Sequence, residues 1–376
     1  MYVPFFKPLI DENEKDWIKK AIENNNLNLQ NEFENKIKKF FNSKHAIATT
    51  NGTSAMHLAL CAMDIKRGDK FICSVNAFVN VPEIIRTFDA EPIFVDIDKN
   101  SFNICPKSFE KALQKNNNKK LKGAFITHVA GNSANMDEIY YLAKKYDIKI
   151  IDDAIRAMGA KFEDKLIGNM ESFISCFQIN PQNQDALATA GFFVTNDDKI
   201  AKEAKILRNH AIVQDYFDKD GNLGYIYDVV NIGVKYDLNS ICAAVAIAQF
   251  EKTNSFIKRR QEIAKKYLQI LKDCPHITLP QTNKNHIFTQ FIIKIDKNRD
   301  GFARELGEKG IATSLHHIPL HLLSYYKNKY KYKVNDFPNA LKNYQQILSL
   351  PIYAAMNDAQ VDYVCENILK IAKNRV

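Results

Sequence analysis

The sequence of 376 residues has no long hydrophobic run. No stretch approaches the roughly 18 uninterrupted apolar residues that a transmembrane helix requires. The first residues, MYVPFFKPLIDENEKDW, become acidic at once and lack the basic and then apolar segments of a signal peptide. These two absences predict a cytoplasmic protein that has no membrane partner.

The sequence also lacks paired cysteines. Its seven cysteines occur singly, and no CxxC motif is present to bind zinc. An odd number of scattered cysteines in a long chain is typical of reduced thiols in a cytoplasmic protein. We therefore expect reduced thiols and no metal site. The seven residues are Cys61, Cys73, Cys105, Cys176, Cys242, Cys274 and Cys365.

Linkers rich in proline or glycine, internal repeats and low-complexity tails are missing too. The composition, 46% hydrophobic and 25% charged, is typical of a soluble globular protein. The chain is long enough for a core divided over two domains. Because no linker separates them, we expect the two domains to pack against each other.

The net charge of +9 comes without a recognisable nucleic-acid-binding module. The excess lysine lies in short runs, such as residues 119–120 and 327–333, among abundant asparagine. We interpret these runs as a coding bias rather than a binding face, and we expect no nucleic-acid partner. A ligand that carries a diphosphate is compatible with the charge.

The first two-thirds of the chain alternates helical and strand patterns. This alternation predicts an α/β domain built around a mostly parallel sheet, and we assign it residues 1–240. Residues 241–376 are expected to form a long linking helix and a smaller α+β domain. The predicted helices are Glu14–Ile22, Glu32–Phe41, Ala55–Ala62, Asp137–Lys145, Ser240–Leu271 and Asp358–Lys373. The predicted strands are Phe71–Cys73, Pro92–Val95, Gly123–His128, Ile148–Ile151, Ser175–Ile179, Gly191–Thr195 and His286–Ile295.

Residues 49–54 form a turn of small residues that opens a helix. Such a turn presents free backbone N–H groups, and the helix dipole adds partial positive charge, so it suits a phosphate. An equally local interpretation is that Thr53 or Ser54 serves only as the N-cap.

A buried-strand pattern at residues 148–153 ends in two carboxylates, Asp152 and Asp153. The carboxyl end of a parallel strand lies at the edge where α/β folds bind ligands. A buried aspartate there needs a cationic or protonated partner. The alternative is that one carboxylate caps the next segment.

Segments along nearly the whole chain resemble, in order, the motifs of the DegT/DnrJ/EryC1/StrS sugar aminotransferases, which are fold-type-I pyridoxal-phosphate enzymes. Residues 51–60 (NGTSAMHLAL) resemble S/N-G-T-x-A-L-H-L-A-L, residues 89–96 (DAEPIFVD) resemble G-A-x-P-V-F-V-D, and residues 152–160 (DDAIRAMGA) resemble E-D-A-A-H-A-L-G-A. Further matches are residues 128–136 (HVAGNSANM), 207–210 (LRNH), 243–249 (AAVAIAQ), 316–321 (HHIPLH), 337–340 (FPNA) and 348–353 (LSLPIY).

The resemblance implies a pyridoxal-phosphate site. Gly52 and Thr53 would hold the cofactor phosphate, and Phe78 would stack on its ring. Asp153 would face the pyridine nitrogen and keep it protonated, so that the ring can accept electrons. His316 and His321, in the C-terminal motif, are the candidate substrate residues. The family also implies a homodimer whose active sites receive residues from both subunits, with Lys235 in the segment that crosses over.

The pattern breaks at the family's lysine. The family reads C-F-S-F-H-P-T-K-N where this chain reads CFQINPQNQ over residues 176–184, so Asn183 replaces the lysine. No other lysine lies between Lys165 and Lys199. A lysine amine binds the cofactor covalently and then shuttles a proton, whereas an amide is neither nucleophilic nor basic. Pyridoxal or pyridoxamine phosphate would therefore be non-covalent, if bound at all.

Other positions depart as well. Gln178 replaces the serine that helps bind phosphate, and Thr189 replaces the glutamate of G-E-G-G. Arg156 replaces the histidine or glutamine near the cofactor's phenolic oxygen, where a guanidinium would pair with a phenolate. Lys235 and Asp237 replace the asparagine and arginine of G-Y-N-Y-R, and Lys235 would reach a phosphate.

Three functions are consistent with these residues, and all concern a nucleotide sugar in surface-glycan biosynthesis. The first is a pseudoenzyme that binds the nucleotide sugar, alone or as a heterodimer with an active paralogue. The second is a pyridoxamine-phosphate-dependent keto-sugar dehydratase, in which His210 or His128 must supply the base. The third is a transaminase whose catalytic groups are non-standard or come from a partner subunit.

Overall fold

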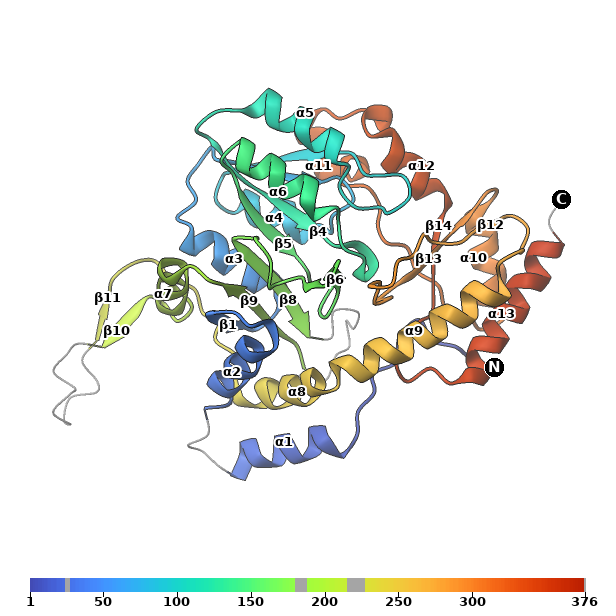
Figure 1. The fold of residues 1–376 in the computed structure, drawn as a ribbon, viewed down its shortest axis with the longest axis horizontal. Helices are drawn as coiled ribbons and strands as arrows, with labels where there is room; N and C mark the ends of the chain where they lie inside the picture. The colour runs from blue at the N-terminus through green and yellow to red at the C-terminus, as the bar shows by residue number, and fades with distance from the viewer. Residues whose placement is uncertain (24–27, 180–187, 215–226, 375–376) are drawn as a thin grey trace.

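The computed structural model describes residues 1–23, 28–179, 188–214 and 227–374. Its centre is a seven-stranded sheet in the order β1-β9-β8-β5-β4-β2-β3, with every strand parallel except β9 (Figure 1). The predicted α/β fold with a mostly parallel mixed sheet is thus confirmed. The strands are β1 (His45–Thr49), β2 (Lys70–Ser74), β3 (Glu91–Val95), β4 (Leu121–Thr127), β5 (Lys149–Asp153), β8 (Ile174–Ile179) and β9 (Ala190–Thr195).

Alternate residues of each strand point to opposite faces of this sheet. Both faces are buried, because helices cover each of them. On β5, Ile151 packs in the cluster that contains α3, α4 and α7, whereas Ile150 packs against α5 and α6. Helices α2 and α8 continue the second layer over β8 and β9. The helices are α1 (Glu12–Glu23), α2 (Leu29–Phe41), α3 (Gly52–Ala62), α4 (Asn80–Arg86), α5 (Pro106–Asn116), α6 (Met136–Lys145), α7 (Asp198–Leu207) and α8 (Ser240–Glu251).

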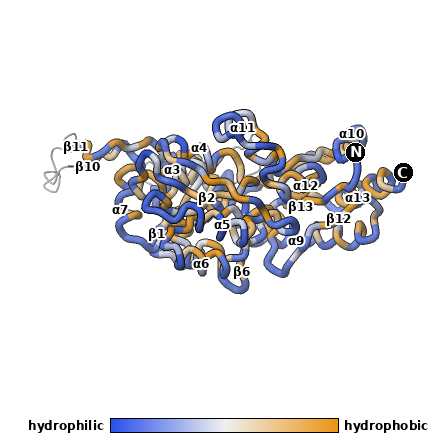
Figure 2. Tube along the Cα trace, turned by 90° about the horizontal axis from the view of Figure 1, so that it is seen from above, coloured by the Kyte–Doolittle hydropathy of each residue, from blue (hydrophilic) through white to orange (hydrophobic). Residues whose placement is uncertain are grey.

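A second core lies in the C-terminal part, around a three-stranded antiparallel sheet. Val3 belongs to this core and bridges to Ile311, so the N-terminal segment begins beside the C-terminal elements. Figure 2 accordingly shows both termini at the same end of the molecule. The elements are β12 (Ile277–Thr278), β13 (Phe291–Ile295), β14 (Ile347–Leu350), α9 (Thr253–Ile270), α10 (Arg299–Glu308), α11 (Ser324–Tyr330), α12 (Pro338–Gln346) and α13 (Asp358–Lys373).

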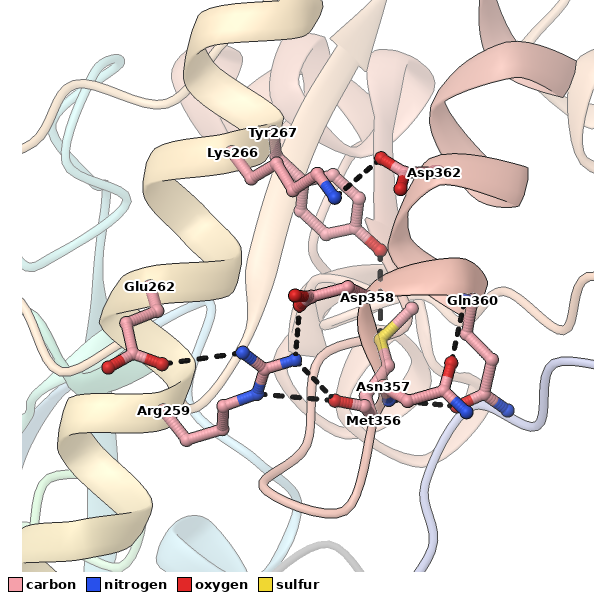
Figure 3. Close-up of polar contacts among 9 residues, drawn as sticks. All are labelled: Arg259, Glu262, Lys266, Tyr267, Met356, Asn357, Asp358, Gln360 and Asp362. Atoms are coloured by element: carbon pink, nitrogen blue, oxygen red, sulfur yellow. Dashed lines mark hydrogen bonds and ion pairs between the residues drawn. The ribbon is translucent and has the colours of Figure 1, made fainter.

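Helix α9 is fixed to the start of α13 by charged contacts (Figure 3). The Arg259 guanidinium donates to Met356 O at 2.8 Å and to Asp358 Oδ1 at 2.7 Å. About two turns further on, Lys266 Nζ lies 2.6 Å from Asp362 Oδ1. These contacts set the orientation of the helix that leads from the large sheet to the second core. Two small hairpins, β6 (Lys161–Phe162) with β7 (Lys165–Leu166) and β10 (Ile212–Gln214) with β11 (Tyr227–Val229), complete the fold.

Two predicted elements are wrong in their extent. The helix expected over Ser240–Leu271 is two helices, because Lys252 ends α8 with a tight turn in which its N–H donates to Gln249 O. Its ammonium is held by Glu14, at 2.5 Å, on the N-terminal helix. The strand expected over His286–Ile295 begins only at Phe291, since residues 287 and 289 donate to Gly131 O and Ala130 O instead.

The extent of one predicted helix is confirmed, and the division of the chain stays open. The terminal helix has the predicted bounds Asp358–Lys373. Each of the seven cysteines is free. No helix among the described residues is both long and apolar enough to cross a membrane, and these residues contain no cluster of His, Cys, Asp and Glu that would suit a metal ion. The division of the chain at residue 240 stays a prediction.

Candidate cofactor and ligand site

The turn before α3 is capped by Asn51, whose side chain accepts from Ser54 N at 2.9 Å. The interpretation of Thr53 or Ser54 as the N-cap is therefore wrong; both lie inside the first turn. Thr53 Oγ1 accepts from Asn80 Nδ2 at 3.3 Å. Gly52 is buried at the helix start, as a phosphate-binding turn requires.

The space in front of this turn is occupied by two side chains from other strands and loops. Gly52 N–H donates to Gln178 Oε1 at 2.9 Å. A Cβ added at Gly52 would lie 2.8 Å from Ile155 Cδ1 and 3.0 Å from Gln178 Oε1. The amide of Gln178 thus takes the place that a phosphate oxygen has at an open helix N-terminus.

The other end of the site consists of the two carboxylates at the end of β5. Asp153 accepts from Thr127 Oγ1 at 2.9 Å and is buried. Burial raises the pKa of Asp153, while the hydrogen bonds and the nearby His128 and Arg156 act in the opposite direction. The residues that follow form turns rather than a helix, and Asp153 accepts from the backbone of Ile155 in that turn, so it caps the next segment without capping a helix.

The predicted partner of a buried aspartate is found beside Asp152. Ser175 Oγ donates to Asp152 Oδ2 at 2.6 Å, and His128 Nε2 lies 3.3 Å from Asp152 Oδ1. His128 Nδ1 accepts from Ala134 N at 3.2 Å, so the ring proton is on Nε2 and faces the carboxylate. His128 is fully buried. It could act as a base only if these contacts were broken.

A pocket that is partly open to solvent adjoins Ile155 and Gln178. It lies between the carboxyl ends of β5 and β8, the N-terminal segment 6–9, and helices α8 and α9. Its cationic lining residues are Lys7, Arg156 and Arg260. The other lining residues are Phe6, Pro8, Leu9, Ile155, Met158, Gln178, Ile179, Gln249, Thr253, Phe256, Thr289, Tyr353 and Ala354.

Both arginines of the pocket lie in a poorly solvated environment. Burial lowers the pKa of Arg156 and of Arg260 to about 10. The charge of Asp153 partly offsets this for Arg156. The Nη1 atom of Arg156 is buried and has no hydrogen-bond partner in the described part of the chain. The two guanidinium groups therefore remain charged near neutral pH, and that of Arg156 is incompletely satisfied.

Two histidines lie close to Arg156. Burial lowers the pKa of His316 to about 2 and of His317 to about 3, and the Arg156 charge contributes in both cases. His316 Nδ1 is 2.8 Å from Ser349 Oγ, and its ring stacks on Phe5. Both rings are neutral near pH 7. A predicted substrate residue, His316, is thus near the pocket without lining it.

Several predicted residues lie elsewhere or make other contacts. Phe78 is half exposed, with its ring 5.2 Å from that of His317. The Lys235 ammonium lies 2.9 Å from Asp237 Oδ1 and donates to Asn209 Oδ1 within its own chain, and its reach to a phosphate stays a prediction. His210 is exposed on the loop after α7. His321 is buried against Phe337 with Nε2 3.0 Å from Val334 O, away from the pocket lining.

Asn183 lies outside the described residues. Two residues of the site escaped the sequence analysis. Ile155 stands where the family motif E-D-A-A-H has its second alanine, and that difference was a usable signal. Arg260 carried no signal, because one arginine in a helical pattern is ordinary.

The family model described as "DegT/DnrJ/EryC1/StrS aminotransferase family" matches residues 8–369, so this chain belongs to that family. The chain is 33% identical to the uncharacterized protein MJ1066 of Methanocaldococcus jannaschii, over 100% of this chain and 99% of that protein. It is 29% identical to the spore coat polysaccharide biosynthesis protein SpsC of Bacillus subtilis, over 99% and 97% of the two chains.

Among solved structures, the PMP-form of the sugar aminotransferase Spr1654 of Streptococcus pneumoniae superposes with a TM-score of 0.91. It is 21% identical and covers 99% of both chains, so the likeness concerns the fold. The fold-type-I aminotransferase fold is thereby confirmed. Family membership supports pyridoxal or pyridoxamine phosphate as the cofactor.

Proposed function

We propose that this chain binds a nucleotide sugar in surface-glycan biosynthesis and does not carry out ordinary transamination. The contact of 2.9 Å between Gly52 N and Gln178 Oε1 carries this proposal. The replacement of the lysine by Asn183 gives a second argument. The residue that would anchor the cofactor covalently and the residue at the phosphate end are both altered. A transaminase needs both to hold its cofactor through repeated half-reactions.

The two ends of the site fit the cofactor unequally. Asp153, with its hydrogen bond from Thr127, fits the ring nitrogen, and Phe78 is free to stack on a ring. The cofactor, when bound, supplies an electron sink. The phosphate end does not fit in this arrangement, since Gln178 and Ile155 fill the space before Gly52. Cofactor binding would therefore be non-covalent and would require Gln178 to move.

The retained Asp153 end favours one alternative, a keto-sugar dehydratase that uses pyridoxamine phosphate. This function needs a base, and the amide of Asn183 cannot act as one. His128 is fully buried, with Nδ1 accepting from Ala134 N and Nε2 lying 3.3 Å from Asp152 Oδ1, and His210 is exposed on a loop. The alternative therefore depends on His210 being brought to the site by assembly.

We further propose a homodimer, or a heterodimer with an active paralogue, in the cytoplasm. The support is an apolar surface next to Lys235 that a single chain leaves exposed. Ile232 is 94% exposed, and Tyr227, Val229 and Val230 are more than half exposed. Several exposed apolar residues within one short segment are typical of a protein interface.

The test is an absorbance titration with pyridoxal phosphate, followed by borohydride treatment. We expect no imine band and no reducible adduct in the wild-type chain. Asn183→Lys alone should bind the cofactor weakly, whereas Asn183→Lys with Gln178→Ser should form the adduct. Calorimetric titration with UDP-, GDP- and dTDP-sugars should detect binding to the wild-type chain. A reducible adduct in the wild type, or failure of every nucleotide sugar to bind, would contradict the proposal.

A further inference from the structure

The pocket beside Gln178 has an unbalanced charge. It is lined by three cations, Lys7, Arg156 and Arg260, and by no aspartate or glutamate among its described lining residues. Cations that share a partly buried pocket repel one another, and the low local dielectric strengthens that repulsion. The cost is offset when an anion lies between them. The charge distribution therefore favours an anionic ligand group.

The two arginines are fixed to one segment of the chain. Arg260 Nε donates to Ile287 O at 3.1 Å, and Arg156 O accepts from Thr289 Oγ1 at 2.8 Å. This segment is itself held, because Ile287 N donates to Gly131 O. Arg260 and the backbone of Arg156 thus do not need to be ordered when a ligand arrives, which reduces the entropic cost of binding.

The helix that carries Arg260 is also fixed. The preceding residue, Arg259, is bound to Met356 O and Asp358, and Lys266 is bound to Asp362 (Figure 3). Arg259 is thus neutralised by acids. Among the described residues, the hydrogen bond found for Arg260 is to a backbone carbonyl, that of Ile287. The two neighbouring arginines differ in role: one anchors the helix, and the other presents its charge to the pocket.

The phosphate site that we expected at the start of α3 is closed. The N–H of Gly52 at the start of α3 is taken by Gln178, and Ile155 occupies the adjoining space. Arg156 follows directly after Ile155 in the sequence, and both line the pocket together with Gln178. The residues that close one anion site therefore border the other.

We propose that the anion site of this protein lies between Arg156 and Arg260, in place of the N-terminus of α3, and that it binds a phosphate or diphosphate group. A guanidinium binds phosphate oxygens through two parallel N–H donors, and Arg156 has a buried Nη1 without a hydrogen-bond partner in the described part of the chain. Phe6 and Phe256 in the walls suit the less polar part of the ligand. The proposal deepens the proposed function by assigning the ligand's anionic group, and it does not depend on which sugar is bound.

The test is calorimetric titration of the full chain with inorganic pyrophosphate at constant ionic strength. We expect the wild type to bind and Arg156→Gln and Arg260→Gln each to weaken binding by about 10-fold to 100-fold. Arg67→Gln removes an exposed arginine and serves as the matched control, with unchanged affinity. Circular dichroism verifies folding. If Arg260→Gln does not fold, Arg260→Lys keeps the charge, loses the paired donors and should still weaken binding several-fold.

Two further arms identify the source of the anion and the competing site. If UDP binds tightly and loses affinity in the arginine variants, the bound anion is the diphosphate of a nucleotide. If pyridoxamine phosphate shows this pattern instead, the bound anion is the phosphate of the cofactor. Gln178→Ser should free the N–H of Gly52 and so add a second anion site at the start of α3. The proposal is overturned if pyrophosphate does not bind, or if the arginine variants bind it like the wild type. Pyrophosphate binding without nucleotide-sugar binding would retain this inference and remove the proposed function.

Discussion

The two ends of the site differ in how their polar groups are satisfied. At the carboxylate end, Asp152 and Asp153 have partners from two neighbouring strands, β4 and β8, and from the buried His128. At the phosphate end, one N–H of α3 is satisfied by a single amide from Gln178. A buried carboxylate needs several placed partners, whereas a helix N-terminus is satisfied by any acceptor. A single substitution should therefore cost more stability at the carboxylate end than at the phosphate end.

The largest expected effect comes from the carboxylate end. Asp152→Ala would leave His128 Nε2 and Ser175 Oγ buried without their acceptor, so we expect a loss of about 3 kcal/mol in the free energy of unfolding. Urea denaturation measures it. Asp16→Ala, at an exposed position of α1, should change the value by less than about 0.5 kcal/mol. Equal effects of the two substitutions would show that the carboxylate end is not the more constrained one.

At the phosphate end, Gly52→Ala places a Cβ against Ile155 and should cost about 2 kcal/mol through overpacking. The contact is with the end of a flexible side chain, so removing that side chain should relieve it. In an Ile155→Ala background we expect Gly52→Ala to cost less than about 1 kcal/mol. A double-mutant cycle by urea denaturation measures the coupling. Additive costs would contradict the close packing that we describe.

The pH dependence of stability tests the surroundings of Arg156. Burial lowers the pKa of His316 to about 2 and of His317 to about 3, below the value of 6.5 in the unfolded chain. Below about pH 6.5 the unfolded chain therefore takes up protons that the folded chain does not, and stability falls as the pH falls. Each histidine contributes about 1 kcal/mol per pH unit. His317→Gln should flatten the fall by that amount; an unchanged slope would disprove the burial of His317.

The smallest effect should have the opposite sign to that of Asp152. Burial raises the pKa of Asp153 above its value in the unfolded chain, so its ionisation costs stability as the pH rises through the raised pKa. Asp153→Asn removes this cost, and we expect a gain of about 1 kcal/mol near pH 7 that disappears at low pH. Thermal unfolding over a pH series measures it. A loss at neutral pH would mean that Arg156 stabilises the ionised form more than burial opposes it.

Much of the fold could be predicted because its signals are local. The buried strand ending in Asp152 and Asp153, the helix after Asn51 and the terminal helix are all found, since hydrophobic period and turn residues lie within each segment. The predicted long helix failed at Lys252, because the side chain that holds the break, Glu14, is on a distant helix. The strand predicted from His286 failed for the same kind of reason, since its first residues bind the backbone of residues 130 and 131.

The candidate site was predicted in part. Gly52, Asp153, Arg156 and Gln178 all lie at or beside one site. Lys235 and His321 satisfy their charges and donors elsewhere, and a sequence motif cannot show which of several partners a long side chain selects. Arg260 was missed because its role depends on the pocket that forms only when α9 lies against the N-terminal segment.

The sequence by itself determined the order of strands and helices, the family, and the replacement of a lysine by Asn183. These are properties of periodicity and motif, and they need no knowledge of contacts. Only the tertiary structure decided that Gln178 reaches Gly52, 126 residues away, and that Arg156 and Arg260 share a pocket without an acid. Such contacts depend on how distant elements pack, because a side chain satisfies its hydrogen bonds and charge with whatever the folded chain places beside it.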